Sequence, residues 1–129
     1  MQASFLCAHL VAAVALYGWT STVSAQTADE PIVQVAKFYP TLGRENELQE
    51  RLLKLVEFVR RAEPKTVYRL HRSSKEPVVF LWYEVYESKA ALEHHRTVVL
   101  PAFRREYGPL PEGIVVRPAE VESYQDISK

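Results

Sequence analysis

VVFLWYEVYESKAALEHHR, the segment of residues 78–96, contains the strongest structural signals in this sequence. Its first half is β-branched and aromatic, which is typical of a buried strand. Side chains alternate between the two faces of a strand, so Trp82, Glu84 and Tyr86 are expected on one face. A carboxylate among aromatic groups is costly to bury without a partner. The strand therefore predicts a polar site in an apolar setting, with Glu84 as its first member.

The second half of the segment predicts a short helix over residues 89–96, close to the end of the strand. Ser88 is a candidate N-cap for this helix, because its hydroxyl can accept a backbone hydrogen bond. His94 and His95 follow, and adjacent helical residues point about 100° apart. We therefore expect one histidine to face the strand and His94 to lie on the surface.

Hydrophobic periodicity elsewhere in the chain indicates a small α+β domain. Strands are predicted at residues 32–39, 66–72 and 114–124, and further helices at 44–62 and 100–107. The long helix is the clearest element, since Leu48, Leu52 and Val56 share one stripe. Pro118 interrupts the last strand, which indicates an edge strand or a bulge. The order βαββαβ predicts a ferredoxin-like fold, a four-stranded antiparallel sheet with both helices on one face.

Helices on one face leave the other face of the predicted sheet uncovered. An exposed apolar surface of that size is typical of an interaction site. Two-fold homodimers are the commonest oligomers of soluble proteins. The sequence therefore predicts a homodimer that packs sheet against sheet.

The composition excludes several classes of protein. The 129 residues suffice for one domain, and 16 basic residues balance 16 acidic ones. Because the chain has no net charge and no cluster of basic residues, no role in nucleic-acid binding is expected. Neither a phosphate-binding glycine loop nor a zinc-binding H-E-x-x-H pattern is present, and the only cysteine is Cys7. We therefore expect no metal and no nucleotide cofactor.

The N-terminal residues differ from the rest. Residues 1–28 contain no Asp, Glu, Lys or Arg, and an apolar run at 10–16 precedes the small-x-small pattern Val23-Ser24-Ala25. This pattern predicts a signal peptide over residues 1–25, followed by one domain over residues 31–124. The apolar run is shorter than the roughly 20 residues that span a bilayer, so no stable membrane span is expected. Cleavage would place the protein in the secretory pathway or outside the cell, whereas a retained leader would leave it cytoplasmic.

Several motifs together resemble one known family over residues 32–107. The matching positions are Pro40, Gly43, Arg44 and Glu45; Glu63, Pro64, Tyr68, Arg69 and Leu70; and Phe80, Tyr83, Glu84, Tyr86, Glu87, Ser88, Ala91, Leu92, His95 and Arg96. In these positions the chain is similar to the antibiotic biosynthesis monooxygenase (ABM) family. The resemblance implies that the ferredoxin-like domain pairs into a dimeric α+β barrel.

The resemblance also implies an activity in secondary-metabolite biosynthesis. Family members of this kind oxidise electron-rich aromatic compounds, such as anthrones and related polyketides, to quinones. The reaction needs no flavin, haem or metal, because molecular oxygen is the co-substrate. A base removes a proton, the carbanion donates an electron to oxygen, and radical recombination gives a hydroperoxide that loses water.

Carried onto this chain, the family motif assigns catalytic roles to His95, Glu84 and Tyr86. Tyr86 stands where many relatives have tryptophan, and Lys65 replaces a common glycine. Haem-degrading relatives need an axial histidine late in the second helix. Residues 96–129 contain no histidine, so haem degradation is not expected.

Each assigned residue also fits a structural role. His95 suits the role of a general base, and it equally suits a structural role in which it links helix and sheet through a carboxylate. Glu84 fits a base or a buried ion pair. Trp82 and Tyr86 fit stacking on a planar substrate or packing in the core or dimer interface.

Two further residues are candidates for substrate binding. Arg69 and His71 share a strand face and suit either a hydrogen bond to a substrate phenol or an exposed cross-strand pair. Three functions remain open at this level. The first is the cofactor-independent monooxygenase, the second is a non-oxidative isomerase, cyclase or decarboxylase, and the third is a dimer that only binds a hydrophobic ligand.

Overall fold

The computed structural model of the chain describes residues 30–128. The signal peptide predicted for residues 1–25 lies outside the described residues. Within the described part, none of the helices combines the length and the apolar character needed to cross a bilayer.

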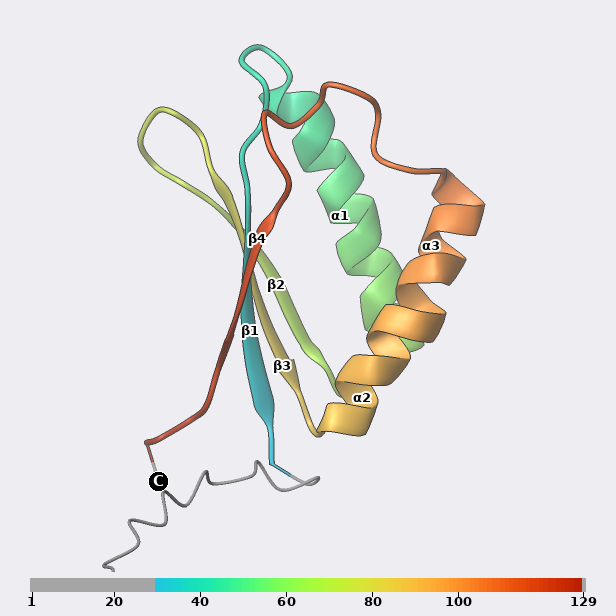
Figure 1. Ribbon diagram of the computed structural model, residues 1–129. Helices are drawn as coiled ribbons and strands as arrows, with labels where there is room; N and C mark the ends of the chain where they lie inside the picture. The colour runs from blue at the N-terminus through green and yellow to red at the C-terminus, as the bar shows by residue number, and fades with distance from the viewer. Residues whose placement is uncertain (1–29, 129) are drawn as a thin grey trace, which may run out of the picture.

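The described chain forms one sheet whose helices lie side by side on a single face (Figure 1). The elements are β1 (Ile32–Phe38), α1 (Glu45–Ala62), β2 (Val67–Arg72), β3 (Phe80–Tyr86), α2 (Lys89–His94), the π-helical segment η1 (His95–Val99), α3 (Leu100–Tyr107) and β4 (Glu120–Tyr124). The sheet has the strand order β2-β3-β1-β4, and every neighbouring pair is antiparallel. The predicted ferredoxin-like α+β fold is confirmed.

The strand register aligns one polar row across the helix-facing side of the sheet. Tyr68 of β2 pairs with Glu84 of β3, which pairs with Gln34 of β1, which pairs with Ser123 of β4. Gln34 Nε2 donates a hydrogen bond of 2.8 Å to Ser123 Oγ, which links the row from β1 to β4. Tyr68, Glu84 and Gln34 are buried, so this row lies under the helices.

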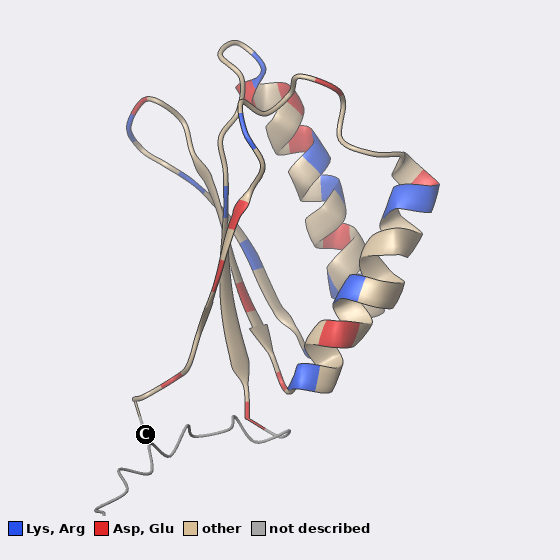
Figure 2. Ribbon diagram, in the orientation of Figure 1, with Lys and Arg blue, Asp and Glu red and all other residues tan. Residues whose placement is uncertain are grey.

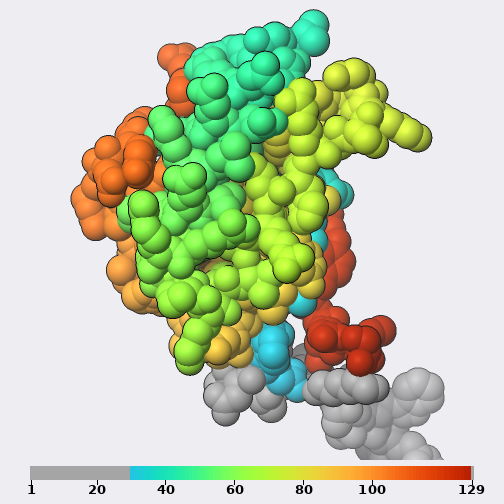
Figure 3. All heavy atoms as spheres, turned by 180° about the vertical axis from the view of Figure 1, so that it is seen from behind, coloured from blue at the N-terminus to red at the C-terminus, as the bar shows by residue number. Residues whose placement is uncertain are grey.

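Helix α1 covers this face with its apolar stripe. Leu48, Leu52, Val56 and Val59 are all buried against the sheet core. Acidic residues occupy its first turn and basic residues its last turn, which complements the helix dipole. Seen from the opposite side, α1 and the β2–β3 hairpin form the surface, with α3 beside α1 (Figure 3).

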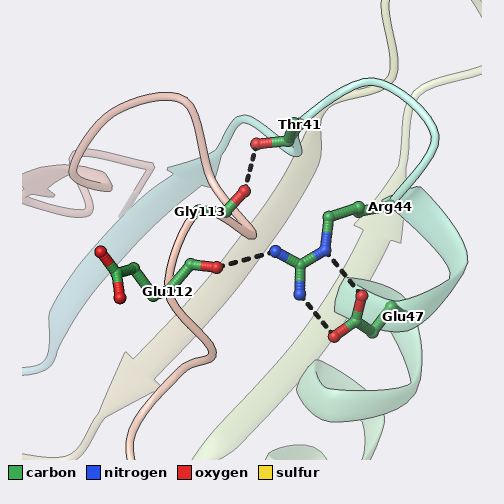
Figure 4. A network of polar contacts seen from close by, with 5 residues as sticks. All are labelled: Thr41, Arg44, Glu47, Glu112 and Gly113. Carbon is green, nitrogen blue, oxygen red and sulfur yellow. Dashed lines mark hydrogen bonds and ion pairs between the residues drawn. The ribbon is translucent and has the colours of Figure 1, made fainter.

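A polar network ties the start of α1 to the segment that precedes β4 (Figure 4). Arg44 donates through Nε and Nη2 to the Glu47 carboxylate, both at 2.7 Å, and through Nη1 to the Glu112 carbonyl at 2.8 Å. Thr41 Oγ1 donates to the Gly113 carbonyl at 2.6 Å. These bonds hold the loop between α3 and β4 across the end of α1, where it can close one side of an internal hollow.

Two predicted elements differ in the structure. The helices expected at 89–96 and 100–107 form one continuous helical stretch, because η1 joins them without a break. The strand expected at 114–124 is shorter: only Glu120–Tyr124 pairs along β1, preceded by an isolated bridge between Pro40 and Val115. Pro118 lies between the two pieces, where it can donate no ladder hydrogen bond.

The outer face of the sheet has no helix over it (Figure 1). Tyr83 and Val67 each expose 38% of their surface on this side. Val33, Val35 and Val85 share the same face by strand alternation. The apolar outer face predicted from the sequence is therefore present in the described chain.

Candidate functional site

A hollow of about 490 Å³ lies between the sheet and the helical layer. This volume falls within the roughly 300–1,000 Å³ that is typical of small-molecule sites. Every layer contributes to the lining, which includes Trp82 and Glu84 of β3, Leu52 and Leu55 of α1, His95 of η1 and Phe103 of α3. The loop that Arg44 holds completes the wall, through Gly108, Leu110 and Val115.

Glu84 and Tyr86 form a hydrogen-bonded pair on the buried face of β3. The two are neighbours on that face because they are two residues apart in a strand. Tyr86 donates its hydroxyl hydrogen to Glu84 Oε2 at 2.7 Å. Burial raises the pKa of Glu84 above its usual value, and the Tyr86 hydrogen bond and the charge of His95 offset only part of this. Burial, with the neighbouring Glu84 carboxylate, also raises the pKa of Tyr86, so this phenol stays protonated.

His95 is held by Glu63, the C-cap residue that directly follows α1. His95 Nδ1 lies 2.6 Å from Glu63 Oε2, and the two side chains are only 4% and 8% exposed. A carboxylate can only accept, so the hydrogen of this bond belongs to Nδ1. Nε2 is then the nitrogen that can take up a proton. The pair has the arrangement of a histidine oriented by an acidic residue.

The backbone around His95 departs from an ordinary α-helix. His95 is the first residue of η1, and single π-helical turns occur frequently at functional sites. Its ring centroid lies 5.5 Å from that of Tyr68 and 5.2 Å from that of Tyr86. The imidazole is therefore fixed by one carboxylate and two aromatic rings. His94, by contrast, is exposed as expected.

Trp82 lies deep in the same wall but is already packed by other rings. Its side chain is 1% exposed, and its ring centroid lies 5.4 Å from Phe38 and 5.2 Å from Tyr68. The indole Nε1 has no hydrogen-bond partner. This environment is that of a core aromatic whose N–H donor has no partner among the described residues.

Arg69 and His71 do not lie in the hollow. Both are exposed on the outer face of β2, where they line a shallow depression with Lys37, Leu81 and Tyr83. The inward side of β2 carries Tyr68 instead, which is buried. The structure therefore separates Arg69 and His71 from the hollow that Glu84 lines, and their role in substrate binding stays a prediction.

Sequence reasoning missed two sets of residues at this site. Glu63 was only a motif position, because no spacing rule connects it with a histidine 32 residues later. Three arginines also line the hollow: Arg51, Arg96 and Arg104. Arg96 was, like Glu63, only a motif position, and helical arginines are usually solvent-exposed, so the sequence did not place any of the three in the hollow.

The fold and site define a ferredoxin-like α+β domain with a buried histidine–carboxylate pair beside an apolar hollow. The antibiotic biosynthesis monooxygenase (ABM) family model matches residues 31–104, and the chain belongs to this family. No curated protein matches the chain in sequence.

Solved structures from several bacteria share the fold. A protein from Caulobacter crescentus CB15, provisionally assigned to the same family, is 27% identical with a TM-score of 0.64, covering 78% of this chain and 92% of that chain. Protein SO0527 from Shewanella oneidensis is 28% identical with a TM-score of 0.60, covering 76% and 92%. A mutant of MhuD, solved with two manganese protoporphyrin IX molecules per active site, is 16% identical with a TM-score of 0.62, covering 76% and 96%, and shows a likeness of fold.

Proposed function

We propose that the protein is a monooxygenase that oxidises an electron-rich aromatic compound with molecular oxygen and without a cofactor. The observation that carries this proposal is the buried His95–Glu63 pair, 2.6 Å apart, beside a largely apolar hollow that also contains Glu84. Family membership supports oxygenase chemistry, and the aromatic substrate is the finer part of the proposal.

In this mechanism, His95 Nε2 removes a proton from an activated CH₂ group of the substrate. Glu63 stabilises the resulting imidazolium through the bond at Nδ1. The substrate carbanion passes one electron to oxygen, and superoxide then joins the substrate radical at the same carbon. The peroxide takes a proton and loses water together with the second hydrogen on that carbon. The balance is CH₂ plus O₂ giving C=O plus H₂O.

Glu84 and Tyr86 have supporting roles in this proposal. The raised pKa of Glu84 makes its carboxyl group able to hold a proton closer to neutral pH than an exposed glutamate. Tyr86 keeps that carboxyl in place through its hydroxyl. The proton that the peroxide needs can therefore come from Glu84 or from the His95 imidazolium.

The MhuD mutant binds a porphyrin, so the proposal that this protein needs no cofactor calls for a test with haem. Among the described residues, His95 is the one histidine that lines the hollow. If haem bound in the hollow, His95 Nε2 would be the histidine nitrogen that could hold its iron, and that nitrogen would then be unavailable as the base. Titration with haemin distinguishes the two: a Soret shift that is lost in His95→Ala would overturn cofactor independence.

The main experiment measures oxygen uptake with anthrone as the probe. We expect one O₂ consumed per quinone formed, and loss of turnover in His95→Ala. His94→Ala is the matched control, because its side chain is exposed one residue away, and it is expected to retain activity. Product formation without oxygen would favour the non-oxidative isomerase, cyclase or decarboxylase. Binding without any turnover would favour the ligand-binding dimer.

We also propose a homodimer through the outer face of the sheet. Its centre is apolar, β2 contributes Arg69 and His71 at one side, and β4 contributes Glu120 and Glu122 at the other. A two-fold axis parallel to the strands would place β2 of one copy over β4 of its partner, with opposite charges facing. Light scattering on the intact chain tests this, and a monomeric mass would refute it.

We also propose that the predicted signal peptide, residues 1–25, is cleaved. Cleavage after Ala25 would place the enzyme in the secretory pathway or outside the cell. Mass spectrometry of the native N-terminus tests this, since an intact Met1 would contradict it.

A further inference from the structure

The charged groups that line the hollow are mostly positive. Arg51, Arg96 and Arg104 contribute three guanidinium groups, whereas Glu84 is the one carboxylate among the lining residues. Guanidinium groups are always charged at physiological pH, and Glu84 is deep in the wall, with only 7% of its surface exposed. An incoming ligand therefore meets a positive potential at the accessible part of the hollow.

Arg51 is already engaged with the wall. Its Nη2 donates to the Gly108 carbonyl, and a longer bond of 3.4 Å reaches the Pro109 carbonyl. Its guanidinium carbon lies 4.8 Å from the centroid of the Phe103 ring. These partners are neutral, so they hold the side chain in place without neutralising its charge.

The side chains of Arg96 and Arg104 have fewer partners than the side chain of Arg51. They come from η1 and α3, and both are exposed at the rim of the hollow. Within residues 30–128, neither side chain forms an ion pair or a hydrogen bond, whereas Arg44 pairs with Glu47 and Arg117 with Glu120. The charge of Arg96 does act on the buried Glu84, whose pKa it lowers. Figure 2 shows basic positions along this helical stretch on the side of the molecule that the helices form.

We propose that the substrate is an aromatic compound with a carboxylate group, which Arg96 and Arg104 bind while the ring system occupies the apolar hollow. This inference rests on the proposed function for turnover, although the binding step can be tested alone. Arginine suits this role because its planar group can form two parallel hydrogen bonds with a carboxylate. A neutral aromatic compound would fill the hollow but offer neither guanidinium group an anionic partner.

The test compares two probes of nearly equal shape, 9-anthroate and the neutral 9-anthracenemethanol. Fluorescence titration of the full chain measures the dissociation constant of each. The partners are at the rim, so we expect 9-anthroate to bind about tenfold more tightly than the alcohol at low salt, with most of the difference lost as salt rises. Arg96→Gln and Arg104→Gln are each expected to weaken 9-anthroate about threefold to fivefold and to leave the alcohol unchanged.

Arg105→Gln is the matched control. Arg105 neighbours Arg104 on α3 and is exposed, but it does not line the hollow. It is expected to leave the affinity for 9-anthroate within about twofold of the parent chain. Equal loss in Arg105→Gln and Arg104→Gln would show a general surface-charge effect and would overturn the proposal.

Failure of this inference is separate from failure of the proposed function. Equal affinity for the two probes would overturn the carboxylate site, even if anthrone is oxidised. Selective binding of 9-anthroate, lost in Arg96→Gln and Arg104→Gln, would support the site even if no oxygen is consumed.

Discussion

Replacing Glu63 by glutamine is expected to reveal how strongly His95 is held. The substitution keeps the shape of the side chain and removes its charge. In the parent chain, Glu63 Oε2 lies 2.6 Å from His95 Nδ1, and both side chains are more than nine-tenths buried. Burial at this level limits screening by water, so the charge contributes more here than it would in a surface ion pair.

The magnitude follows from the kinds of hydrogen bond compared. A hydrogen bond to a charged group contributes about 1.5–3 kcal/mol, and a neutral one about 0.5–1.5 kcal/mol. Glu63→Gln retains an acceptor oxygen, so we expect a loss of about 1–1.5 kcal/mol in the free energy of unfolding. This corresponds to a fall of about 5 °C or more in Tm for a domain of this size. Glu63→Ala leaves Nδ1–H without a partner, and we expect a loss of about 3 kcal/mol.

Urea denaturation at pH 7 measures the loss of stability, and nitrogen NMR of the His95 ring reports which nitrogen carries the hydrogen. The parent chain should show the hydrogen on Nδ1, and Glu63→Gln should shift the ring toward a mixture of tautomers. Glu57→Gln is the matched control, since Glu57 is exposed on the same helix, and we expect a change within about 0.5 kcal/mol.

Two outcomes would refute this reasoning. If Glu63→Gln is as stable as Glu57→Gln, the buried contact contributes no net charge-assisted bond. If the parent ring carries its hydrogen on Nε2, Nδ1 does not donate to Glu63, and His95 Nε2 would not be the base that the mechanism requires.

Three further predictions follow from the same site and the outer face. Tyr86→Phe removes the hydrogen bond that lowers the pKa of Glu84, so carbon NMR titration of the Glu84 carboxyl should show a higher pKa. The free energy of unfolding should fall by about 1.5–3 kcal/mol, and a lower pKa would contradict the assigned cause. The folded-state pKa of Glu84 is raised, so the parent chain should lose stability as the pH rises from the unfolded-state pKa of about 4.3 through the folded-state pKa. Urea titrations of Glu84→Gln across that range should lack this decrease of stability with pH, and an unchanged decrease would assign it to another group. Tyr83→Glu places a charge in the centre of the outer face and should halve the mass measured by light scattering, while Lys65→Glu, an exposed change outside the sheet, should not.

The sequence alone determined the order of strands and helices, apart from η1 and the shorter β4, and which residues share a face of β3. Both follow from local geometry, because strand alternation and helical periodicity act over a few neighbouring residues. Trp82, Glu84 and Tyr86 are therefore on one face in the structure as the alternation requires, and Ser88 caps the following helix through its hydroxyl, which accepts from Ala91 N–H at 3.1 Å.

Only the tertiary structure decided which face of β2 turns inward. In the strand VYRLHR, Tyr68 and Leu70 share one face with Arg72, and Arg69 and His71 share the other with Val67, so each face carries both apolar and charged or polar residues. Packing of α1 on the sheet places Tyr68 inside, because burying a phenol ring costs less than burying an unpaired guanidinium group. Arg69 and His71 are thereby left on the outer face.

The partner of His95 was likewise decided by the tertiary structure. Glu63 ends one helix and His95 starts a π-helical turn 32 residues later, so only the packing of the helical stretch against β2 and β3 brings their side chains together. Local patterns contain no information on such a pair, because nothing in a period of two or 3.6 residues connects positions that far apart. The sequence therefore identified His95 as a candidate, and only the fold identified Glu63 as the carboxylate that orients it.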